Sequence, residues 1–126
     1  MIHRSQLVAI ALAGMLLAAC IPDTGRPETC DEPSVALEVT LVEERLEPGN
    51  LAVCQGQDVT ITVDVQRDGI LHLHGYDDVL PAREVRAGTS EEFVFTAGRI
   101  GEFVIALHTT DGPAEATAGV LTVHER

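Results

Sequence analysis

The feature that most restricts the fold is an alternation of apolar and polar residues from residue 35 almost to the end of the chain. Val59, Ile61, Val63 and Val65 alternate with polar residues, which is typical of a strand with one buried face. No segment beyond residue 33 shows the 3.6-residue stripe of a helix, and turn residues recur at the spacing of an antiparallel sandwich or barrel. The pattern predicts an all-β sandwich of seven or eight strands in residues 34–126. The predicted strands are 35–42, 51–53, 59–66, 70–74, 83–86, 92–96, 102–108 and 119–124.

The first 19 residues are predicted to be a signal peptide. Arg4 precedes an apolar run over residues 7–19, which ends in Leu17-Ala-Ala-Cys20. The run is shorter than the roughly 20 residues that span a bilayer, and the small residues before Cys20 favour peptidase cleavage. This segment resembles a bacterial lipoprotein signal, although a plain secretory signal is an alternative. The resemblance implies export and an anchor of acyl chains on Cys20, at the periplasmic or extracellular face of a bacterial membrane.

Residues 20–33 are predicted to be a lipidated, disordered tether, because they contain three prolines and a glycine without apolar periodicity. With Cys20 assigned to the lipid, Cys30 and Cys54 remain as an even pair in an oxidising compartment. We expect these two cysteines to form a disulfide with each other. A metal-binding role for the pair is the alternative.

The charge of the chain excludes several functions. The whole chain carries a formal charge of −12, and residues 1–19 hold one Arg and no acid, so the mature chain would carry −13. Such a surface repels phosphate backbones, and we expect no nucleic-acid partner. Solubility of an exported domain is the simplest use of most carboxylates. The chain has no Lys, which excludes Schiff-base chemistry and a Gly-Lys-Ser/Thr phosphate loop. We expect a monomer.

The segment His72-Leu-His-Gly-Tyr-Asp77 is the strongest functional signal. Two histidines two residues apart on a strand project from one face, which is a spacing suited to metal ligands. His108, at the end of another predicted strand, is a third candidate. The alternatives are a solvated surface pair for His72 and His74, and a turn cap or a hydrogen bond to a backbone carbonyl for His108. We expect His124 to be solvated and Tyr76 to anchor the end of a sheet.

Five segments together resemble one known family. They are Gly56-Gln-Asp-Val-Thr-Ile-Thr-Val63, the His72–Asp77 segment, Val85-Arg-Ala-Gly-Thr89 with Glu92-Phe-Val-Phe-Thr96, Gly101-Glu-Phe-Val-Ile-Ala-Leu-His108 and Gly119-Val-Leu-Thr-Val123. In this organisation residues 35–126 resemble the cupredoxins, whose fold is an eight-stranded Greek-key sandwich. In that family the first copper histidine opens a His-x-x-x-aromatic-Asp segment, which implies that His72 is a copper ligand. His74 falls where the family usually has an apolar residue.

The chain departs from the family at the second half of the copper site. The resemblance places Leu107 where the family has its Cys ligand, and the loop after His108, residues 109–118, holds neither His nor Met. Blue-copper electron transfer depends on a thiolate bound to copper, so we expect no blue-copper carrier. A site of His72, His74 and His108 would be rich in nitrogen and would suit Cu(II) better than Zn(II). The candidates for an oxygen ligand are Asp77, Asp78, Asp111 and Glu115.

The His-x-His-aromatic strand also resembles that of copper-zinc superoxide dismutases. Only four histidines follow residue 19, too few for the binuclear site of those enzymes. A mononuclear copper enzyme and a metal-free interaction module remain alternatives. The predicted function is a lipid-anchored domain that binds copper or passes it to or from a partner protein, with no catalytic residues.

Overall fold

The computed structural model describes residues 25–112 and 114–126, so the predicted signal peptide and the lipidation site Cys20 lie outside the described residues. No helix in the described part is long and apolar enough to cross a bilayer. This part contains nine strands and one short 3₁₀ helix. The elements are η1 (Glu28–Asp31), β1 (Ser34–Val42), β2 (Arg45–Glu47), β3 (Asn50–Cys54), β4 (Asp58–Val65), β5 (Gly69–Leu73), β6 (Arg83–Val85), β7 (Ser90–Thr96), β8 (Gly101–His108) and β9 (Ala116–His124).

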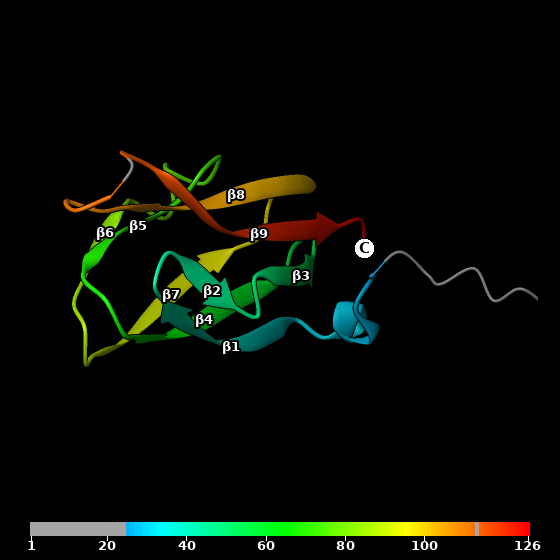
Figure 1. Ribbon diagram of the computed structural model, residues 1–126. Helices are drawn as coiled ribbons and strands as arrows, with labels where there is room; N and C mark the ends of the chain where they lie inside the picture. The colour runs from blue at the N-terminus through cyan, green and yellow to red at the C-terminus, as the bar shows by residue number, and fades with distance from the viewer. Residues whose placement is uncertain (1–24, 113) are drawn as a thin grey trace, which may run out of the picture.

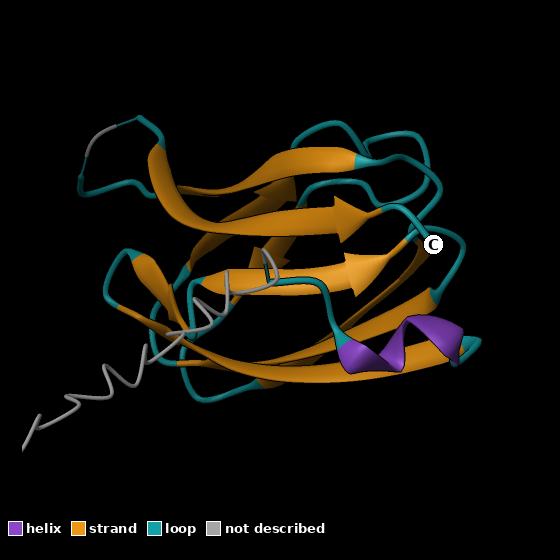
Figure 2. Cartoon of the chain, turned by 90° about the vertical axis from the view of Figure 1, so that its right-hand side faces the viewer, coloured by secondary structure: helices purple, strands orange, loops and turns teal. Residues whose placement is uncertain are grey.

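The strands form two sheets that pack face to face (Figures 1 and 2). One sheet has the order β2-β1-β4-β7, and the other has the order β3-β9-β8-β5-β6. The predicted all-β sandwich is therefore confirmed. Two pairs, β1 with β4 and β3 with β9, are parallel rather than antiparallel. The sequence could not show this, because the two-residue alternation of side chains is the same in both kinds of pair.

The core lies between the sheets and follows the alternation. In β4 the four residues Val59, Ile61, Val63 and Val65 are buried, while Thr60 and its alternating neighbours face outward. Burying such a side chain contributes about 1.5–3 kcal/mol. Three aromatic rings in and beside this core pack together. Tyr76 contacts Phe95 and Phe103 edge to face, with ring centroids 5.2 and 4.8 Å apart.

Strand β2 has no counterpart among the predicted strands. It is three residues long and buries only Leu46, so it offers no alternation to recognise. Its pairing with β1 depends on the turn between them, where Glu43 has a φ of 52°. That left-handed conformation is uncommon for a residue with a side chain. The nine strands thus exceed the expected seven or eight by this short edge strand.

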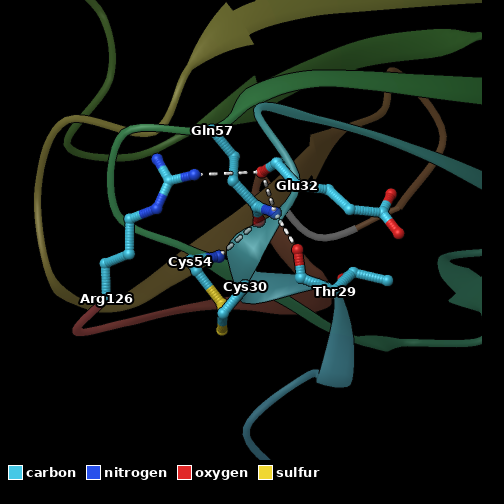
Figure 3. Close-up of a disulfide and its surroundings, with 6 residues drawn as sticks. All are labelled: Thr29, Cys30, Glu32, Cys54, Gln57 and Arg126. Atoms are coloured by element: carbon cyan, nitrogen blue, oxygen red, sulfur yellow. Dashed lines mark hydrogen bonds between the residues drawn. A yellow bond between two sulfur atoms is a disulfide. The ribbon is translucent and has the colours of Figure 1, made fainter.

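The end of the predicted tether is fixed to the sandwich (Figure 3). Cys30, in η1, forms a disulfide with Cys54 at the end of β3, with their Cα atoms 5.3 Å apart. Beside it lies Gln57, a fully buried polar residue. Its Oε1 accepts a hydrogen bond from the Cys54 backbone N–H at 2.8 Å. Its Nε2 donates to the carbonyl oxygens of Thr29 and Glu32 at 2.7 and 3.0 Å. The chain segment from Glu28 onward therefore belongs to the folded body.

Candidate metal centre

Three histidines gather on the outer face of the five-stranded sheet. In β5 the side chains of Leu71 and Leu73 are buried in the core, so His72 between them faces outward. His74 continues this alternation just after the strand, and its backbone N–H donates to Val104 of β8 at 2.9 Å. His108 ends β8 opposite Ile70, which is exposed on the same face. The expectation that His72 and His74 share a face agrees with this arrangement.

The spacing of the three rings is compatible with one ion. The ring centroid of His72 is 4.2 Å from that of His74 and 6.2 Å from that of His108. A metal about 2.0 Å from a ring nitrogen lies about 3.2 Å from the ring centroid, so two imidazoles on one ion have centroids at most about 6.4 Å apart. Both separations meet this limit. The imidazole donors also suit Cu(II) by type.

Each histidine contacts a hydrogen-bond acceptor. Nε2 of His72 pairs with Asp77, and Nε2 of His74 lies 2.7 Å from Oε1 of Glu115. An ionised carboxylate can only accept, so both Nε2 atoms carry the hydrogen and both Nδ1 atoms keep a lone pair when the rings are neutral. The hydrogen bond from His72 also lowers the pKa of Asp77 below its ordinary value. Asp77 therefore stays ionised at lower pH than an ordinary aspartate.

His108 has the opposite arrangement of its ring nitrogens. Its Nδ1 lies 3.0 Å from the carbonyl oxygen of Ala114, and a carbonyl can only accept a hydrogen. Nδ1 is therefore the donor, and Nε2 of the neutral ring carries the lone pair. A backbone carbonyl that fixes one nitrogen in this way is a common support for a metal-binding histidine.

The four candidate oxygen ligands separate into two pairs. Asp78 accepts a hydrogen bond from Arg99 at 2.8 Å, and Asp111 accepts one from Arg67 at 2.6 Å. These two carboxylates are neutralised by guanidinium groups. The other two, Asp77 and Glu115, contact the histidines themselves. The structure thus singles out two candidates that the sequence left unranked.

The donor atoms of these side chains do not point at one common position. Within residues 25–112 and 114–126, no three His, Cys, Asp or Glu side chains are placed to hold a metal as they stand. The Nε2 atoms of His72 and His74 are directed at carboxylates instead. A shared ion would require at least one of these pairs to open. The metal role of His72, His74 and His108 remains a prediction.

The position that the cupredoxin resemblance assigns to a copper-binding cysteine is filled by a core residue. Leu107 is fully buried and lies opposite Leu71 in the neighbouring strand, so its side chain points into the sandwich. Cys30 and Cys54 are joined to each other, and both methionines of the chain, Met1 and Met15, precede the predicted mature start. No sulfur ligand for copper is therefore present in the described part.

The structure also places the other residues that the sequence marked. Tyr76 is buried, and its hydroxyl donates to the carbonyl of Arg99 at 2.9 Å and accepts from its N–H at 3.0 Å, which confirms the predicted anchor. His124 lies at the end of β9, opposite Cys54 in β3. Ala116, at the other end of β9, pairs with Leu107 next to the histidines. His124 is thus remote from the candidate site.

The fold is similar to that of copper proteins of known structure. A blue copper oxidase from Nitrosomonas europaea aligns with a TM-score of 0.60 at 14% identity, over 74% of this chain and 39% of that chain. Auracyanin A, a blue copper protein from Chloroflexus aurantiacus, aligns with a TM-score of 0.55 at 16% identity, over 72% and 99%. Auracyanin from Roseiflexus castenholzii aligns with a TM-score of 0.51 at 21% identity, over 70% and 95%.

The extent of these matches limits what they imply. The chain spans 39% of the multicopper oxidase mgLAC and 42% of the copper nitrite reductase from Nitrosomonas europaea, but nearly all of the auracyanins. No family model matches the sequence, and no curated protein sequence matches it either. Identities of 14–21% establish architecture alone. The chain therefore has a cupredoxin-like fold.

Proposed function

We propose that this chain is an exported, lipid-anchored domain that binds Cu(II) and passes it to or from a partner protein. The observation that carries the proposal is the gathering of His72, His74 and His108 on one face of a cupredoxin-like sandwich. Ordinary packing does not require three imidazoles at these distances. The copper proteins of similar fold support copper as the metal.

The exposure of the site favours transfer over storage. The side chains of His74 and His108 are 43% and 37% exposed, and that of His72 is 19% exposed. An ion held there would be open to an incoming ligand from a partner. The partner's donor atoms could then replace the histidines one at a time.

The absence of sulfur donors from the described part argues against electron transfer. A blue-copper centre needs a thiolate, and its potential is tuned by a weak axial ligand. Here Leu107 occupies the corresponding position inside the core. Imidazole and carboxylate donors hold Cu(II) well but stabilise Cu(I) poorly, since the soft cuprous ion prefers sulfur.

Calorimetric titration at pH 7.5 tests the proposal. We expect one Cu(II) per chain, with weaker binding of Zn(II). Where residues 1–19 are retained in the protein, it should carry His3→Ala, so that a histidine near the amino terminus cannot bind copper. Binding should weaken between pH 7.5 and pH 5, because protons compete with the metal for the imidazoles. Absence of binding, or affinity that does not change between pH 7.5 and 5, would contradict the proposal.

A metal-free interaction module is the second candidate function. The pairs His72–Asp77 and His74–Glu115 favour it, because each satisfies an imidazole without a metal. On this alternative the same titration gives no heat beyond dilution.

The proposed lipid anchor is tested by replacing Cys20 with serine. A serine hydroxyl cannot form the thioether to the lipid, so the variant should carry no acyl chains and should be left either unanchored or unprocessed. Fractionation of cells that express the full chain checks this, with Cys54→Ser as the control that alters a cysteine without removing the anchor. Unchanged membrane association of Cys20→Ser would contradict the anchor.

A further inference from the structure

Glu115 lies between two of the histidines. Its Oε1 is 2.7 Å from Nε2 of His74, and its Oε2 is 3.9 Å from Nε2 of His108. The three groups come from different parts of the chain, since His74 follows β5, His108 ends β8 and Glu115 immediately precedes β9. One carboxylate thus faces nitrogens that are 34 residues apart in the sequence.

The contact with His108 is not explained by a hydrogen bond. Nδ1 of His108 donates to Ala114, so Nε2 of the neutral ring is an acceptor, and the Glu115 oxygen that faces it is an acceptor as well. While His108 is neutral, two acceptors 3.9 Å apart gain nothing from each other directly, although a protonated ring would form an ion pair there. Their separation matches the sum of a metal–nitrogen and a metal–oxygen bond of about 2.0 Å each.

We propose that Glu115 is the oxygen ligand of the copper site, opposite Nε2 of His108. This inference rests on the proposed function and assigns the fourth donor. His74 can join through Nε2 once its hydrogen moves to Nδ1, an exchange of tautomers that water catalyses for a neutral imidazole. Asp77 has a different role: its carboxylate holds the ring of His72, whose Nδ1 remains available.

The other three carboxylates are weaker candidates for the oxygen ligand. Asp78 and Asp111 are engaged with Arg99 and Arg67, and their negative charge is compensated there. Asp77 contacts His72 alone among the three histidines, whereas Glu115 contacts two. The carboxylate that reaches two of the imidazoles is the better ligand.

Copper affinity and electron paramagnetic resonance of Glu115→Gln test the assignment. The amide preserves the shape of the side chain but removes the anionic donor. We expect the Cu(II) affinity to fall at least about 10-fold and the copper hyperfine splitting to change. A loss of about 10-fold is the lower end of the range for removing a residue that only supports a metal ligand. Glu102→Gln is the matched control, because it removes one exposed charge from the outer face of β8. Its affinity should stay within about 2-fold, as expected for a surface charge.

The variant Asp77→Asn tests whether Asp77 binds the metal or only holds the ring of His72. The asparagine carbonyl can still accept from His72, so the hyperfine pattern of this variant should match that of the wild type. If Glu115→Gln binds copper with the wild-type affinity, or binds it more weakly with an unchanged spectrum, Glu115 is not a ligand although copper binding stands. If the wild type binds no copper, the proposed function is wrong and the assignment falls with it.

Discussion

Replacing Gln57 with leucine will lower the free energy of unfolding by about 3 kcal/mol. A loss of this size is expected because a buried donor is left unsatisfied and further hydrogen bonds are lost. Gln57 is fully buried and bridges two segments of the chain. Leucine has a similar size but leaves the Cys54 N–H without its 2.8 Å acceptor. The carbonyls of Thr29 and Glu32 each keep another donor, so the Cys54 amide carries most of the cost.

Urea unfolding with the disulfide intact measures this effect. Gln55→Leu is the matched control, because it makes the same replacement two residues away, where the only side-chain hydrogen bond is long, at 3.4 Å, and exposed. We expect the control to change stability by less than about 0.5 kcal/mol. A Gln57→Leu variant as stable as the wild type would show that the buried amide does not fasten the 29–32 segment to the sandwich.

Much of the sandwich could be predicted because the alternation of buried and exposed side chains repeats along the chain. Each strand that faces both core and water must alternate, and eight of the nine strands in the described part show enough of this pattern to be found. Strand β2 could not be found, since one buried residue, Leu46, makes no period. The direction of strand pairing could not be predicted either, because side chains alternate in the same way in parallel and antiparallel pairs.

The candidate site was predictable only where it lies on strands. The shared face of His72 and His74 follows from their spacing on β5. The approach of Glu115 depends on the conformation of the segment before β9, which carries no periodic signal. Gln57 is a similar case: it belongs to a Gly-Gln-Asp turn that reads as exposed, and only the fold shows that its amide is buried.

The double variant His72→Ala, His74→Ala will lose at least about 100-fold in Cu(II) affinity. Loss of a single supporting partner alone costs about 10- to 100-fold, and this variant removes two proposed ligands. Both side chains face outward from the sheet, so the fold should survive, and urea unfolding can verify that. His124→Ala is the control, because it removes an imidazole from the far end of β9. Equal copper affinity in the double variant and the wild type would place the site elsewhere.

In the proposed site, imidazole and carboxylate groups bind copper without a thiolate. The absorption spectrum of the chain loaded with one equivalent of Cu(II), with His3→Ala as its single substitution, shows whether sulfur binds the metal. Because Leu107 stands in the core and Cys30 is joined to Cys54, the described residues offer no thiolate for charge transfer to copper, and the proposed acyl anchor occupies Cys20. We predict a pale complex with only weak bands in the visible range. An intense blue sulfur-to-copper band from the loaded protein would show that a thiolate binds the metal and that the proposed site is wrong.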